Sequence, residues 1–192
     1  MKRKKAIGTI LLAGGATVVG FSGYEWYSLT KIPDKNYLLG KKSLLAELAE
    51  TIIPATDNTP GAKEAGAVEF MLPMLNECTD NKTLNRFIKG LQDLEEYIQS
   101  KYHREFSSCS QEEKEAILQW AEQKSKVSNS LLNKIKSKFT GRPFFEMLKT
   151  YTLYGYCISE KGASLGMHYI AVPGKYLPCI RLEPNQTSWA TK

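Results

Sequence analysis

At 192 residues with 42% hydrophobic side chains, the chain is long enough for one folded domain with a real core, and nothing indicates a second domain. The net charge of +6 divides equally, since the first thirty residues carry +3 and the remainder carries only +3. In that remainder lysines are interspersed with glutamates, which leaves no basic stripe to follow a nucleic-acid backbone and excludes a nucleic-acid partner.

Residues 1–30 are predicted to be an export signal or a membrane anchor. The basic segment from Lys2 to Lys5 precedes an apolar run from Ala6 to Gly23 that contains no charged residue. This order is typical of a secretory signal. The run is slightly shorter than the ~20 residues that span a bilayer comfortably, and no Ala-x-Ala cleavage site follows it. We expect an exported, periplasmic protein, and both cleavage and anchoring in the inner membrane stay open.

A polar linker is expected over residues 31–42, and the folded domain over residues 43–192. The first helix of that domain is predicted from Ser43, its cap, to Ile53, because Pro54 stops it.

The next loop, residues 55–61, offers Thr59 as a helix cap and Pro60 as the first helical position. We interpret the loop as a turn between helices with side-chain-to-backbone hydrogen bonds. The alternative, a ligand or metal site, would use Thr56, Asp57 and Asn58. A helix over residues 67–76 follows, interrupted or kinked at Pro73.

The strongest helix is predicted from Lys82 to about Tyr102. Its single apolar stripe consists of Leu84, Phe87, Ile88, Leu91, Leu94 and Ile98. Ser110 and Glu113 form a capping box that opens another helix, and a further one is predicted around residues 131–139.

Pro143 starts a helix that ends near Gly155, and Ser159 caps the last helix, with Glu160 placed against its dipole. Alternating strand patterns are absent. The fold class is therefore all-α, a single irregular bundle of about six or seven helices.

The C-terminal part is rich in tyrosine, whose rigid apolar body and polar tip suit protein contacts. Its aromatic residues recur at spacings that no single helix face can gather, so some should stay outside the core. The alternative is a tyrosine-rich cap that closes the bundle. The predicted partner interface comprises Tyr154, Tyr156, Ser159, Glu160, Tyr169, Tyr176 and Trp189.

A search for chemistry finds no catalytic, cofactor-binding or metal-binding residues. His103 and His168 lack ligands at metal-binding spacing, and adjacent glutamates on a helix point in different directions. Phosphate loops, dinucleotide fingerprints, nucleophile elbows and haem attachment motifs are all missing.

Four cysteines without metal-ligand spacing, Cys78, Cys109, Cys157 and Cys179, fit an oxidising compartment and are disulfide candidates. A disulfide between Cys78 and Cys109 is disfavoured by distance. A helix of about 30 Å separates the two residues, and the seven residues after it can extend back only ~23 Å. Cys157 with Cys179 is feasible. Crossed pairs, a bridge to another subunit, and buried reduced thiols stay open.

Two motifs, in this order, resemble the gluconate 2-dehydrogenase subunit 3 family. The first comprises Leu48 to Asp57 (LAETIIPATD), Thr59 to Ala62 (TPGA), and Ala65-Gly66. The second comprises Gly155 to Ala163 (GYCISEKGA), Tyr169, Pro173 to Tyr176 (PGKY), and Cys179. The resemblance covers roughly Leu44 to Trp189 and is specific because both motifs are present.

This resemblance implies a small, non-catalytic subunit that helps to fold and export a large subunit. The large subunit would be a sugar or polyol dehydrogenase of the glucose-methanol-choline type that holds FAD, often with a cytochrome c subunit. Membrane contact would come through the N-terminal segment or through the complex. Proteins resembling this family often carry a twin-arginine signal, and here the pair is Arg3-Lys4, which leaves the export route open.

Two other interpretations remain. One is an independent enzyme with an unfamiliar site, which activity of the chain alone would indicate. The other is a periplasmic, membrane-anchored scaffold unrelated to redox chemistry, which the lack of a neighbouring flavoprotein gene would favour. The sugar or polyol substrate cannot be read from this chain.

Overall fold

The computed structural model describes residues 29–126 and 142–172, and in the C-terminal part residues 174–175, 179, 181, 184 and 186–190. Within these residues it contains seven α-helices, one short 3-10 helix and no strand, which confirms the all-α fold class. The elements are α2 (Lys35–Gly40), α3 (Lys42–Ile52), α4 (Ala67–Cys78), α5 (Asn81–Tyr102), η1 (Phe106–Ser108), α6 (Gln111–Ser125), α8 (Phe144–Ile158) and α9 (Glu160–Leu165).

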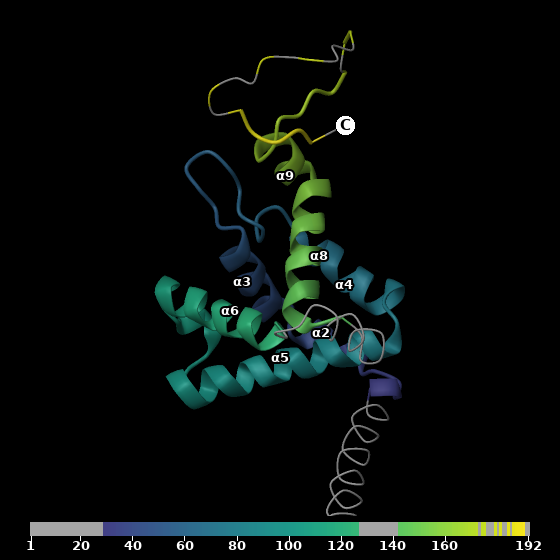
Figure 1. Cartoon of the computed structure of the whole chain (residues 1–192), viewed down its shortest axis with the longest axis vertical. Coiled ribbons are helices and arrows are strands. Elements are labelled where there is room, and N and C mark those ends of the chain that lie inside the picture. The colour runs from purple at the N-terminus through teal and green to yellow at the C-terminus, as the bar shows by residue number, and fades with distance from the viewer. Residues whose placement is uncertain are drawn as a thin grey trace, which may run out of the picture.

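Helix α8 is the central element of the bundle. It packs against α3, α4, α5, α6 and α9, and Figure 1 shows it upright, with α5 and α6 lying across its lower end. Phe87 of α5 is fully buried, and its ring lies 5.0 Å from that of Phe144 at the start of α8. Leu148, one turn further, is also fully buried. Because each such side chain contributes about 1.5–3 kcal/mol on burial, this contact is a main part of the core.

The backbones of α8 and of the start of α4 approach each other closely at Gly155. A Cβ atom built on Gly155 would lie 2.6 Å from the Ala67 carbonyl oxygen and 2.9 Å from the Ala67 Cα atom. Real side-chain carbons do not approach backbone atoms so closely, and the packing therefore requires glycine at this position.

Several predicted helices are confirmed. Helix α5 begins at Asn81 and buries the whole predicted apolar stripe. The capping box is present, since Ser110 Oγ accepts from the Glu113 N–H and the Glu113 carboxylate accepts from the Ser110 N–H. Helix α8 starts after Pro143 as predicted, but it continues three residues past Gly155. The helix predicted around residues 131–139 lies outside the described residues.

The segment predicted as a polar linker contains helix α2. The Asp34 carboxylate caps it by accepting the Asn36 N–H at 3.0 Å, and Leu38 is fully buried in the core. The predicted Ser43 cap is wrong, because α3 begins at Lys42 directly after the turn at Lys41 that ends α2. The linker interpretation missed this helix because burial of one leucine stabilises a segment too short to show a periodic pattern.

The helix start predicted at Thr59 and Pro60 is also wrong. The chain forms a turn there, in which Thr56 Oγ1 accepts the Thr59 N–H at 3.1 Å. Helix α4 begins only after Gly66, whose φ of 74° lies in the left-handed region that favours glycine. Pro73 lies inside α4, and the helix continues past it to Cys78 without interruption. The predicted turn with side-chain-to-backbone bonds is confirmed.

None of the helices between residues 29 and 126, or from residue 142 onward where the chain is described, combines the length and apolarity that crossing a bilayer requires. The predicted export or anchor segment lies outside the described residues.

Candidate partner-docking surface

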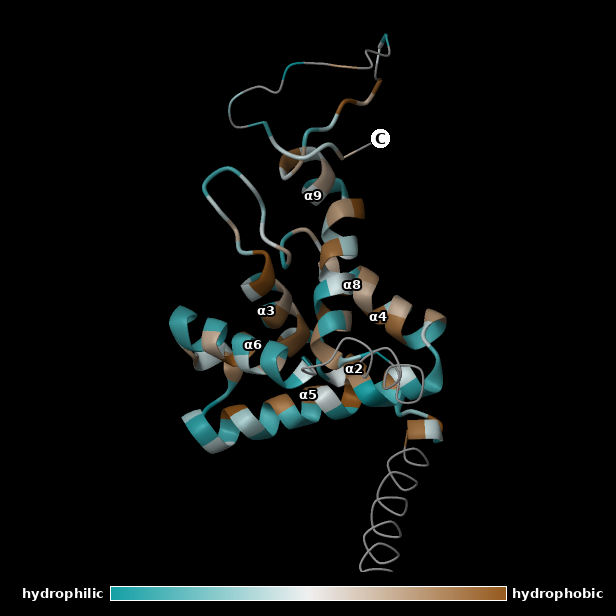
Figure 2. Ribbon diagram, viewed as in Figure 1, coloured by the Kyte–Doolittle hydropathy of each residue, from teal (hydrophilic) through white to brown (hydrophobic). Residues whose placement is uncertain are grey.

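The outward face of α8 changes from charged to apolar along the helix. Glu146 and Lys149 are exposed in its first half, whereas Leu153, Tyr154 and Ile158 are exposed in its second half. Tyr154 and Ile158 are 58% and 64% exposed, and they stand one turn apart on the same face. Figure 2 shows brown, hydrophobic ribbon at the end of α8 near α9. This end of α8 therefore presents apolar side chains to solvent.

The apolar exposure continues past the end of α8. Among the described residues ten large hydrophobic side chains are exposed, and eight of them lie between residues 153 and 189. We call Leu153, Tyr154, Ile158 and Leu165 the α8–α9 surface. The other four are Tyr169, Ile170, Val172 and Trp189. A gathering of this kind on one part of a surface marks a contact site more often than scattered exposure does.

The end of the chain returns to the region after α9. The His168 N–H donates to the Ser188 carbonyl at 2.8 Å, and the Ala190 N–H donates to the His168 carbonyl at 3.0 Å. The His168 and Trp189 rings meet edge to face with centroids 4.2 Å apart. These contacts hold Trp189 beside the residues that follow α9, next to the exposed Tyr169.

Tyr156 is not part of the exposed surface, which corrects the prediction for this residue. Its side chain is only 8% exposed, and its hydroxyl donates to the Pro60 carbonyl at 3.0 Å. Burial raises the pKa of this hydroxyl. Tyr156 faces inward because it lies on the same side of α8 as the buried Thr152, four positions earlier. It ties the end of α8 to the loop before α4.

Ser159 acts as a structural cap. Its Oγ accepts the Gly162 N–H at 3.0 Å and donates to the Tyr156 carbonyl at 2.8 Å, so it fixes the corner between α8 and α9. The predicted cap is confirmed. Glu160 is exposed in the first turn of α9. It lies at the positive N-terminal end of the helix dipole, as predicted. The predicted interface residue Tyr176 lies outside the described residues.

The loop between α3 and α4 is held from within by Glu50. Its carboxylate accepts the Ala55 N–H at 3.0 Å and the Lys63 N–H at 2.8 Å, and it fills the space beside Gly61. The hydroxyls of Thr56 and Thr59 lie 2.8 Å apart and bond to each other. These groups hold the loop in place, and the alternative of a ligand site there gains no support from them.

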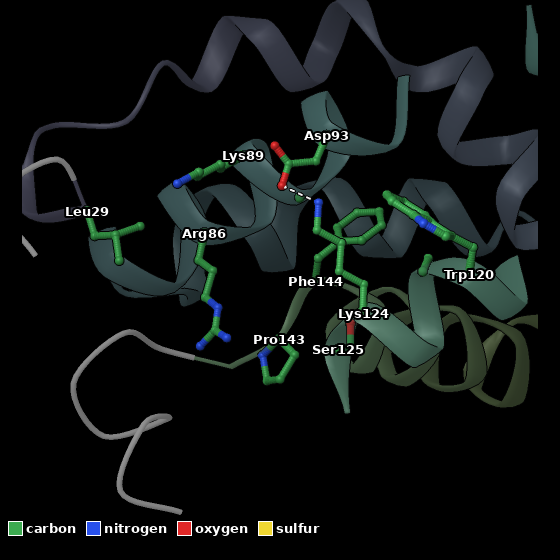
Figure 3. A pocket seen from close by; sticks show the side chains of 11 residues that line it. Leu29, Arg86, Lys89, Asp93, Trp120, Lys124, Ser125, Pro143 and Phe144 are labelled. Carbon is green, nitrogen blue, oxygen red and sulfur yellow. Dashed lines mark hydrogen bonds and ion pairs between the residues drawn. The ribbon is translucent and has the colours of Figure 1, made fainter. Parts of the chain in front are cut away.

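A surface hollow of about 200 Å³ lies where α5, α6 and the start of α8 meet. Figure 3 shows Lys124 directed at Asp93, with Phe144 and Trp120 nearby, and the ion pair measures 2.8 Å. Arg86 also lines the hollow. The described residues that line it include no histidine or cysteine, and the carboxylate among them, that of Asp93, is paired with Lys124. We assign no chemistry to this hollow.

The cysteines are unpaired in the structure. Cys78 and Cys179 are exposed, Cys157 is half-buried and Cys109 is buried. Burial raises the pKa of the Cys109 thiol, which lowers its reactivity. The disulfides therefore stay a prediction. Over the described ranges, no three side chains of the metal-binding types gather as an ion would require.

Sequence reasoning missed Leu153, Ile158 and Leu165 as exposed residues. Helical spacing could have identified Ile158, because it stands four residues after Tyr154 and therefore on the same helix face. The prediction considered only aromatic and polar residues and therefore left out the aliphatic ones.

Comparison with protein families matches residues 40–174 to gluconate 2-dehydrogenase subunit 3. No match exists among the curated proteins or the solved structures. The family match spans the first sequence motif, the second as far as Gly174, the helices from α3 to α9 and the whole α8–α9 surface. The chain therefore belongs to the gluconate 2-dehydrogenase subunit 3 family.

Proposed function

We propose that this chain is the non-catalytic small subunit of a periplasmic, FAD-dependent sugar or polyol dehydrogenase complex. It folds with the large flavin-containing subunit of the glucose-methanol-choline type, escorts it through export and stays docked on it. FAD belongs to that partner, and a cytochrome c subunit would pass electrons onward. The family match over residues 40–174 is the observation that carries this proposal.

Two further observations support it. The basic start and apolar run within residues 1–23 have the form of an export segment. The exposed apolar residues at the end of α8 suit a subunit that is normally covered.

The chain is expected to be catalytically silent by itself. The assay compares the purified chain, the purified flavin subunit and the co-expressed pair, each with added FAD, a dye acceptor and a panel of sugars and polyols. Only preparations that contain the flavin subunit should reduce the dye. Turnover by the isolated chain would overturn the non-catalytic assignment.

Export should depend on the N-terminal basic residues. Replacing Lys2, Arg3, Lys4 and Lys5 with glutamine removes the charge that precedes the apolar run, so both this chain and the flavin subunit should accumulate in the cytoplasm. Cell fractionation followed by immunoblotting measures both proteins. If the variant chain is retained while the flavin subunit still reaches the periplasm, the escort role is wrong.

A further inference from the structure

The outer face at the end of α8 has the apolar composition of a buried helix face. Among the described residues of this chain, no element covers it. Gly155 and Tyr156 are buried on its inner side, while Leu153, Tyr154 and Ile158 are exposed on its outer side. One turn earlier the outer side carries Lys149, as a solvated face normally does. An apolar outer face confined to the last turns of a helix indicates that something docks there.

The charges around this surface favour a protein over a lipid bilayer. The exposed charged residues of α8 and α9 are Glu146, Lys149, Glu160 and Lys161, two of each sign. Lys161 is moreover paired with Glu64 at 3.0 Å. A helix that binds an anionic lipid surface carries an excess of Lys and Arg on its polar face. A mixed polar rim around apolar and aromatic residues is typical of a protein interface.

The position of the surface in the molecule agrees with this choice. Figure 1 shows α9 and the C-terminal end of α8 at one end of the bundle, whereas the purple start of the described chain lies at the other end. There the Leu29 carbonyl accepts a hydrogen bond from Asn85 of α5 at 2.9 Å. Helix α8, whose 15 residues span about 22 Å, separates the two ends. The α8–α9 surface therefore lies at the opposite end of the bundle from the start of the described chain.

We propose that the α8–α9 surface is where the large flavin-containing subunit docks, with Tyr154 and Ile158 as its anchors. This inference rests on the proposed function, because it takes its partner from there. The two side chains would enter an apolar pocket of the large subunit, and Glu160 and Lys161 would lie on the polar rim. Helix α8 is rigid where it carries them, because Tyr156 and Ser159 tie its end to the Pro60 carbonyl and to α9.

The test substitutes Ile158 by aspartate, which places a charge in the proposed contact. The matched control is Ile32→Asp, because Ile32 is 91% exposed and lies before α2, outside the α8–α9 surface. Each variant is co-expressed with the proposed FAD-dependent dehydrogenase subunit, and affinity is measured by titration of the purified proteins. Ile158→Asp should weaken binding at least about thirtyfold, while Ile32→Asp should change it less than about twofold.

A second substitution, Tyr154→Ala, keeps the test valid if Ile158→Asp fails to fold. It removes an exposed ring without adding charge, and circular dichroism should show the wild-type melting temperature for the isolated chain. Wild-type affinity in both variants would overturn the docking site while leaving the proposed function intact. If the wild-type chain itself does not bind the flavin subunit, the proposed function falls and this inference falls with it.

If a second copy of the chain or a membrane covers the α8–α9 surface instead, the experiments give different results. Sedimentation of the isolated chain would reveal a dimer that Ile158→Asp dissociates if a second copy covers the surface. Flotation with anionic lipid vesicles, lost in the same variant, would point to a membrane. Either result together with unchanged binding of the flavin subunit would overturn the proposal.

Discussion

We expect the Gly155→Ala variant to lose about 2 kcal/mol of folding stability. The added methyl group would lie 2.6 Å from the Ala67 carbonyl oxygen. Overpacking of this kind costs about 1–3 kcal/mol, and the upper end applies because the obstacle is backbone and cannot rotate away. The better helix propensity of alanine returns only ~1 kcal/mol. For a domain of this size the melting temperature should fall by about 4–8 °C.

Gly40→Ala is the matched control for this change. Gly40 also lies in a helix, but a Cβ atom there would meet no heavy atom within 4 Å. The same methyl group should therefore leave the melting temperature unchanged or raise it slightly. Thermal unfolding followed by circular dichroism compares the two variants. Equal stability of Gly155→Ala and the wild type would mean that α4 and α8 do not approach as closely as described.

The elements that sequence reasoning predicted are those with strong local signals. Helix α5 has a long apolar stripe, so its period alone identifies it, and Ser110 and Ser159 have side chains that cap a helix wherever the chain allows one. These signals need no knowledge of the tertiary structure.

The elements it missed depend on contacts between distant segments. Helix α2 has only six residues, and burial of Leu38 by the rest of the fold decides its existence. Thr59 and Pro60 have the residue types of a helix start. The Pro60 carbonyl instead accepts a hydrogen bond from Tyr156, 96 residues away, and Thr59 bonds within its own turn. Local propensity could not reveal either partner.

The structure buries one tyrosine of the predicted interface and exposes another, and this difference also depends on contacts between distant segments. Spacing showed that the tyrosines near the C-terminus could not all face one way, but it could not show which would face inward. The direction depends on where α8 meets α4 and the loop before it. That packing buries Tyr156 and leaves Tyr154, two residues earlier, exposed.

Tyr156→Ala should therefore cost about 3–5 kcal/mol in folding, as the removal of a large buried aromatic side chain does. Tyr156→Phe keeps the ring and removes only the hydroxyl, leaving the buried Pro60 carbonyl without its donor. That variant should cost about 1–3 kcal/mol. Tyr154→Ala is the matched exposed change, and it should alter stability by less than about 0.5 kcal/mol.

Urea unfolding of the isolated chains gives these three free energies, and titration with the flavin subunit gives the affinities. We expect the two tyrosines to separate cleanly, since Tyr156→Phe should lower stability with little effect on the affinity of the folded fraction. Tyr154→Ala should do the reverse. If Tyr156→Ala folds as stably as the wild type and instead loses the flavin subunit, then Tyr156 is an interface residue, and the burial of its side chain against the loop before α4 is wrong.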